Sequence, residues 1–318
     1  MSDIVTKATR QGYAEGLLYL GEHDDKVIVM DADLASATQT KKFRDAYPDR
    51  FFNAGIAEQN LMSVAAGLSL SGFTVFASSF AMFASGRAFE QVRNSIGYPH
   101  LNVKVAATHG GISVGEDGAT HQCNEDLALM RTIPGMTVIN PADAVEAKAA
   151  VIAVSKIDGP CYLRFGRLAV PVIYDEKDFI YEIGKANVLR EGRDVTIIAT
   201  GLMVNEALIA FEKLRDAGIS ARIIDMHTIK PLDTDAVSRA ASDTGAIVTA
   251  EEHSIIGGLG GAVSEYTAEN CPVPVVKVGV NDVFGCSGPA KDLLKKFGLD
   301  SEDIVRSARA AISKKYKK

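Results

Sequence analysis

Short apolar runs alternate with longer amphipathic segments along the first half of the chain. The apolar runs, which are typical of buried strands, lie at residues 27–30, 51–53, 73–77, 103–107, 137–139 and 161–165. The longer segments have the apolar spacing of a helix and lie at residues 5–20, 57–71, 81–95, 125–131 and 142–155. This alternation predicts a mostly parallel sheet that helices cover on both faces.

The alternation stops in a polar stretch and then begins again. Beyond that stretch we expect strands at residues 195–199, 221–225, 246–250 and 273–280, a helix at residues 205–217, and a glycine-rich helix between the last two strands. We therefore predict an α/β protein with two domains, one at residues 1–172 and a smaller one at residues 191–318, joined by a linker at residues 173–190.

Composition and charge narrow the class of protein. The formal net charge of −6 disfavours nucleic acid as a partner, because such binding needs clustered basic charge. Residues 59–86 hold no charged side chain, but several serines and Gly72 divide this stretch into a buried helix and a buried strand, so we expect no membrane span. The four cysteines lack metal-type spacing and no signal core follows the N-terminus, which favours free thiols, no metal site in this chain, and a cytoplasmic location.

The run HGGISVGEDGATHQ at residues 109–122 is the strongest candidate for chemistry. It holds two of the six histidines, His109 and His121, together with an acid pair and four glycines. Dense glycines let a backbone approach a ligand closely, and imidazoles beside carboxylates can bind hydroxyls and move protons. The run directly follows the predicted strand at residues 103–107, and ligands of α/β sheets bind beyond the carboxyl ends of strands. A polar surface loop is the alternative interpretation.

Two further motifs follow neighbouring predicted strands. In GIAEQN, residues 55–60, Glu58 begins an apolar helix, where an unpartnered charge would be costly. The alternative interpretation is a carboxylate in the first turn of the helix that the helix dipole stabilises. In SSFAMFASGR, residues 78–87, Phe80 and Phe83 lie on one helical face, where they either pack in the core or stack on a flat heterocycle.

Together these motifs resemble the pyrimidine-binding domain of transketolase, a thiamine-diphosphate enzyme, and the resemblance extends from about residue 8 to the C-terminus. It implies that Glu58 shares a proton with the pyrimidine ring of the cofactor, that Phe83, with Phe80, stacks on this ring, and that Asp33 lies near it. The chain has Gly86 where the family often has a tyrosine, and Ala37 where it has a phosphate-contacting serine.

The same resemblance implies roles toward the substrate. His109 and His121 would contact ketose hydroxyls and help to move protons, which makes them catalytic together with Glu58. Asp117 would bind the C2 hydroxyl of the acceptor, and Arg167 and Arg10 would bind the sugar phosphate, for which guanidinium groups are well suited.

Half of the family's cofactor site is missing from the sequence. Family members bind the diphosphate and its Mg²⁺ through a Gly-Asp-Gly run, which this chain lacks. The resemblance is therefore to the C-terminal section of a split transketolase. It implies an N-terminal partner subunit that carries the diphosphate and metal ligands, an α2β2 heterotetramer, and transfer of a two-carbon ketol unit between sugar phosphates, either of the pentose phosphate pathway or of a specialised one.

Two alternatives stay open. The β subunit of a 2-oxo-acid dehydrogenase E1 component shares the pyrimidine domain, but the Gly-Glu-Asp-Gly-x-Thr-His pattern favours transketolase. The second alternative is a non-catalytic assembly subunit of the same fold. It is disfavoured because the chain keeps all five of the candidate site residues Glu58, Phe83, His109, Asp117 and His121.

Overall fold

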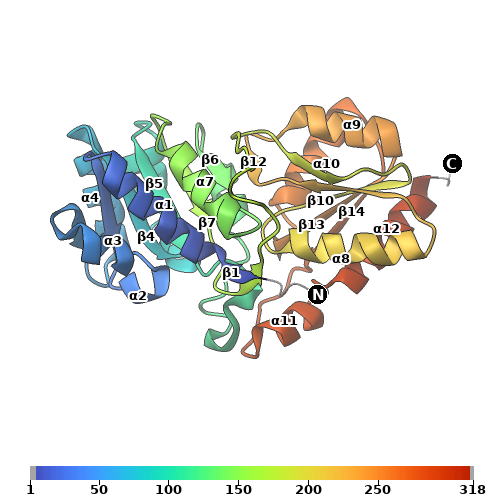
Figure 1. The fold of residues 1–318 in the computed structure, drawn as a ribbon, viewed down its shortest axis with the longest axis horizontal. Helices are drawn as coiled ribbons and strands as arrows, with labels where there is room; N and C mark the ends of the chain where they lie inside the picture. The colour runs from blue at the N-terminus through green and yellow to red at the C-terminus, as the bar shows by residue number, and fades with distance from the viewer. Residues whose placement is uncertain (1–4, 316–318) are drawn as a thin grey trace.

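The computed structural model describes residues 5–315 and contains two α/β domains side by side (Figure 1). The first contains a seven-stranded sheet in the order β12-β6-β7-β5-β4-β2-β3. Its strands are β2 (Val27–Asp31), β3 (Phe51–Asn53), β4 (Thr74–Phe80), β5 (Val103–Thr108), β6 (Thr137–Ile139), β7 (Cys161–Arg164) and β12 (Thr228–Lys230). All but β12 are parallel to their neighbours, which confirms the predicted mostly parallel sheet.

Helices cover both faces of this sheet. On one face, α1 (Thr9–His23) packs along α7 (Ala144–Val154), and Tyr13 and Leu17 of α1 are fully buried in a core with Phe76. On the other face lies α4 (Glu58–Leu70), whose Leu61 is fully buried. Burial of a side chain of this size contributes roughly 1.5–3 kcal/mol. Asp143, the residue that caps the N-terminus of α7, accepts a hydrogen bond from the Glu146 amide. The remaining short helices of this domain are α2 (Ala35–Thr38), α3 (Lys41–Ala46), α5 (Phe89–Gln91) and α6 (Asp126–Arg131).

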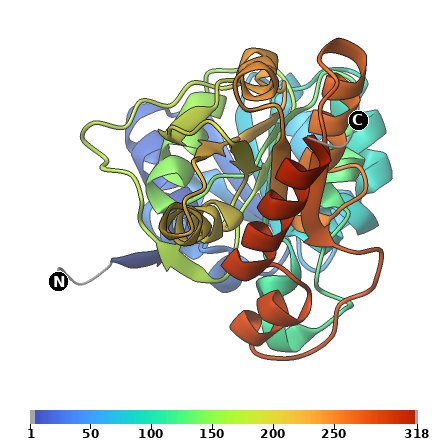
Figure 2. The same ribbon diagram turned by 90° about the vertical axis from the view of Figure 1, so that its right-hand side faces the viewer.

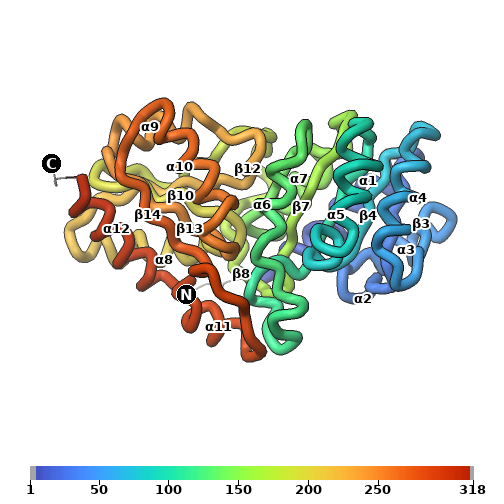
Figure 3. The backbone as a smooth tube through the Cα atoms, turned by 180° about the vertical axis from the view of Figure 1, so that it is seen from behind, coloured from blue at the N-terminus to red at the C-terminus, as the bar shows by residue number. Residues whose placement is uncertain are grey.

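The second domain has a five-stranded sheet in the order β14-β13-β10-β11-β9. Its elements are β9 (Asn187–Arg190), β10 (Val195–Ala199), α8 (Met203–Asp216), β11 (Ala221–Asp225), α9 (Thr234–Thr244), β13 (Ile247–Ser254), α10 (Leu259–Asn270), β14 (Val275–Val280), α11 (Ala290–Lys296) and α12 (Ser301–Lys315). Figure 2 shows α12 running across this domain. In the view from behind, α10 and β14 face the same side as α6 and α5 of the first domain (Figure 3).

The two domains share structure beyond simple contact. Strand β12 follows the second domain's β11 in sequence, yet it pairs antiparallel with β6 and completes the first domain's sheet. Strand β9 lies entirely within residues 173–190, which we predict to be the linker, and pairs with β11. The domain boundaries themselves stay a prediction.

A buried carboxyl pair lies where the two domains meet. Glu146 of α7 and Asp225 at the end of β11 are both fully buried, and the Tyr174 hydroxyl donates a 2.6 Å hydrogen bond to Asp225. Burial is the main cause that raises the pKa of Asp225 to about 7, and burial together with the Asp225 charge raises the pKa of Glu146 well above its usual value. At least one proton is therefore held in this pair around neutral pH.

Two predicted helices differ from the structure. The helix expected at residues 5–20 begins only at Thr9, because β1 (Thr6–Ala8) pairs antiparallel with β8 (Ala169–Pro171). The helix expected at residues 81–95 is mostly made of π-helical turns at Met82–Arg87 and Val92–Gly97. Its buried side chains recur every four residues, a spacing that suits the wider turn, at Ala84, Ala88, Val92 and Ile96.

Two simpler expectations about the chain can be compared with the structure. The four cysteines are free thiols, as predicted. Over residues 5–315, no helix is both long and apolar enough to cross a membrane.

Candidate active site

The predicted site residues lie along the carboxyl edge of the seven-stranded sheet. Strands β3, β2, β4, β5 and β7 are parallel neighbours, so their carboxyl ends share one edge. Asp33 follows β2, Phe80 ends β4, His109 follows β5 and Arg167 follows β7, while Glu58 begins α4 just beyond β3. The prediction that Phe80 and Phe83 share a helical face is wrong, because β4 extends through Phe80 and the helical segment begins only at Met82. Residues far apart in sequence are thus aligned where α/β sheets bind their ligands.

Four aromatic rings form the centre of this edge. The His109 imidazole stacks on the Phe80 ring with centroids 3.8 Å apart. The Phe83 ring also stacks on Phe80, with centroids 6.0 Å apart. His121 meets Phe83 edge-on, with centroids 5.3 Å apart and an interplanar angle of 78°. Phe80 and His109 are buried, whereas Phe83 and His121 are only half-buried. We call these four residues the ring cluster, and its accessible members are Phe83 and His121.

His109 is held in one orientation and protonation state. Its backbone has a φ of +59°, and the ring nitrogens lie 2.8 Å from the Thr108 hydroxyl and 3.3 Å from the Arg10 guanidinium. Because Arg10 can only donate, Nε2 must accept and Nδ1–H must donate to Thr108. Burial, with the charges of Arg10 and Arg167, lowers the pKa of His109 to about 3, so the imidazole is neutral at physiological pH.

Two arginines flank the ring cluster. Arg10 also donates to the Ala37 carbonyl at 2.8 Å, and its buried Nε has no partner among the described residues. Arg167 donates to the Val114 carbonyl and, at 3.1 Å, to the exposed Glu116 carboxylate. Burial and the neighbouring charge of Arg167 lower the pKa of Arg10. An anion bound between these two guanidinium groups would relieve their repulsion.

Glu58 lies farther along the same edge. Three strand steps separate β3 from β5, which corresponds to about 14 Å of sheet. The sequence predicts an apolar enclosure around Glu58, and here the structure differs: Ile56 is 84% exposed and Val64 is 40% exposed. Glu58 itself is half-buried, so this chain alone does not fully enclose the carboxyl group.

The two predicted aspartates occupy exposed positions. Asp33 has a φ of +64°, and it exchanges two 3.0 Å hydrogen bonds with the Asn53 side chain, one of them through its backbone amide. Asp117 lies at the end of a 3₁₀ segment, Ile112–Asp117, and its side chain is open to solvent. The structure therefore brings the histidines, phenylalanines and arginines together, with Glu58, Asp33 and Asp117 at the periphery.

A buried polar group beneath the 109–122 loop was not anticipated from the sequence. Arg164 donates to Asp126 at 2.8 Å and to the Cys123 and Glu252 carbonyls, and the Glu252 carboxylate accepts from the Ser113 amide. Charged residues at the ends of the apolar strands at residues 161–165 and 246–250 are the signal that would have revealed them.

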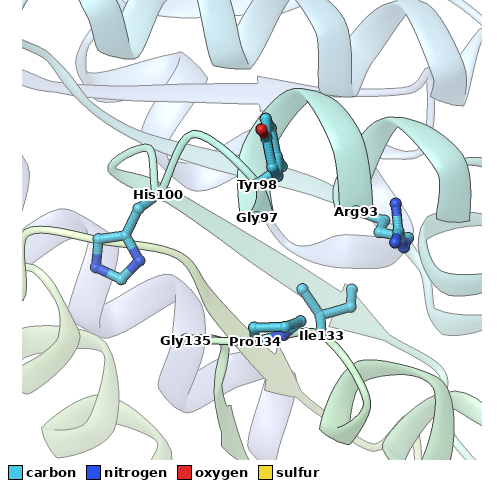
Figure 4. Close-up of a pocket in the computed structure, with 7 residues that line it drawn as sticks. All are labelled: Arg93, Gly97, Tyr98, His100, Ile133, Pro134 and Gly135. Carbon is cyan, nitrogen blue, oxygen red and sulfur yellow. The ribbon is translucent and has the colours of Figure 1, made fainter.

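A pocket of about 330 Å³ lies away from this site, lined by Tyr98, His100 and Pro134 among others (Figure 4). These residues precede β5 and β6, so the pocket lies at the amino edge of the sheet, opposite the ring cluster. Over residues 5–315, no group of three or more His, Cys, Asp or Glu side chains is arranged to hold a metal ion.

Comparison with known proteins agrees with this architecture. Residues 5–172 match the family described as transketolase, pyrimidine binding domain, and residues 184–304 match transketolase, C-terminal domain. The chain is 51% identical over 304 residues to a putative transketolase C-terminal section of Methanocaldococcus jannaschii, covering 95% of each chain. It is 46% identical over 306 residues to a subunit of the 6-deoxy-6-sulfo-D-fructose transketolase of a Clostridium species, covering 96% of this chain and 95% of that one.

A solved structure gives the same result. The fold superposes with a TM-score of 0.89 on a split-gene transketolase described as an inactive β4 tetramer, at 52% identity, covering 97% of this chain and 99% of the other. The chain therefore belongs to the transketolase family and corresponds to the C-terminal section of its split members.

Proposed function

We propose that this chain is the C-terminal subunit of a split transketolase that transfers a two-carbon ketol unit from a ketose phosphate to an aldose phosphate. The observation that carries the proposal is the ring cluster flanked by Arg10 and Arg167, because it combines a flat apolar surface, two imidazoles and two permanent positive charges at one sheet edge. The family membership and the split relatives support it.

The residues present fit one half of thiamine diphosphate. The half-exposed Phe83 ring, backed by Phe80, suits an aminopyrimidine, and Glu58 offers a carboxyl group at the same edge. When bound, this cofactor supplies carbanion chemistry at its thiazolium ring. Glu58 would hold a proton against the pyrimidine, and Asp33 would lie near the cofactor.

The other half of the cofactor does not fit this chain. A diphosphate needs a divalent cation with oxygen ligands, and the described residues form no such group. We therefore assign Mg²⁺ and the diphosphate to an N-terminal partner subunit, in an α2β2 heterotetramer. The same partner would cover Ile56 and complete the enclosure of Glu58.

The remaining residues would act on the sugars. The neutral His109 can donate to or accept from a hydroxyl only if Arg10 or Thr108 gives up its contact, whereas the half-buried His121 is directly accessible and is the better candidate for moving a proton. Arg167 and Arg10 would bind the phosphate, and Asp117 the C2 hydroxyl of the acceptor. The relatives named for sulfofructose and for apulose 4-phosphate make a specialised sugar as reasonable a substrate as a pentose phosphate. We place this reaction in the cytoplasm.

Activity with and without the partner tests this proposal. We expect the purified chain alone to bind negligible thiamine diphosphate, measured by calorimetry, and to show no ketol transfer. Addition of an N-terminal subunit that contains the Gly-Asp-Gly motif should restore both. Turnover by the isolated chain would contradict the partner assignment. A complex that releases CO₂ from 2-oxo acids but transfers no ketol unit would favour the dehydrogenase alternative.

A further inference from the structure

The loop that carries the candidate catalytic histidines rests on the second domain. Ile112 of the loop is fully buried in the hydrophobic core of that domain, together with residues of β10 and α8. Gln122, at the loop's far end, donates a 2.9 Å hydrogen bond to the Cys286 carbonyl, in the segment before α11. The position of His109 and His121 therefore depends on residues outside the pyrimidine-binding domain.

Glu252 makes the closest polar contact between the second domain and this loop. It lies near the end of β13, is 3% exposed, and accepts a 2.5 Å hydrogen bond from the Ser113 amide. A Cβ atom on Gly111, which has a φ of +86°, would lie 2.3 Å from the Glu252 carboxyl carbon. Only glycine lets the backbone rest this closely on the carboxyl group.

Arg164 connects Glu252 to both ends of the loop. Its guanidinium donates to the Glu252 carbonyl at 2.9 Å and to the Cys123 carbonyl at 3.1 Å. Cys123 in turn accepts a 2.8 Å hydrogen bond from the Gly111 amide. Arg164 thus contacts the end of the loop directly and its start through the Cys123 carbonyl, while Glu252 contacts the loop at Ser113.

Burial and neighbouring charges act in opposite directions on the Glu252 carboxyl group. Burial raises the pKa of its carboxyl group to about 7, while the Arg164 charge and the bond from Ser113 oppose this rise and the Asp126 charge adds to it. The carboxyl oxygen can accept from Ser113 in either protonation state, but more strongly when ionised.

The preceding residue provides a matched comparison. Glu251 is 1% exposed on the same strand, and its carboxylate accepts two 2.7 Å bonds from the Leu259 and Gly260 amides, at the start of α10. Glu251 therefore does within its own domain what Glu252 does across the domain boundary.

We propose that Glu252 is a positioning residue of the active site, which holds the 109–122 loop so that His109 and His121 keep their places in the ring cluster. This inference rests on the proposed transketolase function. Through Glu252, the second domain would influence the reaction by fixing the position of the 109–122 loop.

Three variants test this role: Glu252→Ala, Glu252→Gln and the control Glu251→Ala. The first readout is amide hydrogen exchange in the chain without its partner, which does not require activity. We expect Glu252→Ala to speed exchange at Ser113 and its loop neighbours at least tenfold, Glu252→Gln to give an intermediate rate because it keeps a neutral acceptor, and Glu251→Ala to speed exchange only at the start of α10.

The second readout is kinetics of the assembled complex. We expect kcat to fall tenfold or more in Glu252→Ala, to recover to at least half of the wild-type value in Glu252→Gln, and to stay within twofold in Glu251→Ala. An equal loss of kcat in the Glu251 and Glu252 alanine variants, or unchanged exchange at Ser113, would overturn the proposal.

Two further outcomes are decisive. If Glu252→Ala does not assemble, Glu252→Gln must still exchange faster at Ser113 than the wild type, and an unchanged rate would overturn the inference. If the wild-type complex shows no ketol transfer but the Glu252 variants show the expected faster exchange at Ser113, the proposed function is refuted and the positioning of the loop by Glu252 still holds.

Discussion

The imidazole of His109 lies nearly parallel to the phenyl ring of Phe80, with 3.8 Å between centroids and 26° between planes. This stacking buries the imidazole, and burial is the largest cause of its lowered pKa. The ring is therefore an uncharged hydrogen-bonding group, whose two nitrogens are already oriented by Thr108 and Arg10.

His109 is expected to stay neutral from pH 5 to 8. Because its folded-state pKa is lowered to about 3, its contribution to stability is present above the unfolded value of 6.5 and is lost as the pH falls toward 3. A titration of histidine side-chain NMR signals checks this, and Arg10→Met should move the midpoint upward because one positive neighbour is removed. A His109 midpoint near 6.5 in the wild type would contradict the buried, arginine-flanked geometry.

Glu58→Gln in the assembled complex is expected to lower kcat by roughly 100- to 1,000-fold, because a proton on the pyrimidine can no longer be placed. The fraction of assembled complex, measured by size-exclusion chromatography, should not change. Gln59→Ala is the control, since Gln59 is exposed at the same helix start. Near-normal turnover of Glu58→Gln would show that this carboxyl group has no catalytic role and only begins the helix.

Arg167→Ala and Arg10→Ala are expected to raise KM for phosphorylated acceptors by about ten- to a hundredfold, since a charge-assisted contact contributes about 1.5–3 kcal/mol. Unphosphorylated acceptors should be much less affected. Arg93→Ala, at the pocket on the opposite edge of the sheet, is the matched control. Equal losses with both acceptor types would show that these arginines do not bind the phosphate.

The buried pair of Glu146 and Asp225 predicts a pH-dependent stability. Both folded-state pKa values are raised, that of Asp225 to about 7. The stabilising contribution of Asp225 is therefore complete below its unfolded value near 4 and is lost as the pH rises through 7, and that of Glu146 is lost in the same direction. We expect Glu146→Gln to reduce this loss. The Tm of the variant minus the Tm of the wild type should be roughly 3–6 °C larger at pH 8 than at pH 5. The exposed control Glu265→Gln should differ from the wild type in Tm by the same amount at both pH values. A wild-type Tm that does not change between pH 5 and pH 8 would contradict a proton held by Glu146 and Asp225.

The sequence predicts the strands of the first sheet well, because they depend on local signals. An apolar strand followed by a glycine-rich or aromatic segment indicates that Phe80 and His109 lie near strand ends. The contact between their rings depends on the pairing of β4 with β5, which no local pattern predicts. The start of α1 at Thr9 was missed because it depends on pairing with residues 169–171, more than 150 positions away.

Long-range contacts also explain why part of the site was missed. Glu252 lies 139 positions beyond Ser113, and no periodicity connects the two. The enclosure expected around Glu58 is incomplete for a related reason: Ile56 and Val64 are exposed, because no other part of the described chain covers them.

The pairing of β12 with β6 has a consequence for how such chains can be divided during evolution. A break introduced anywhere in residues 173–190 would separate the first domain from the strand that ends its sheet, and β6 would present unpaired backbone groups to water. Recombination at that position would also detach Glu252 from the loop beneath which it lies. Exchange of the two domains together would preserve both contacts.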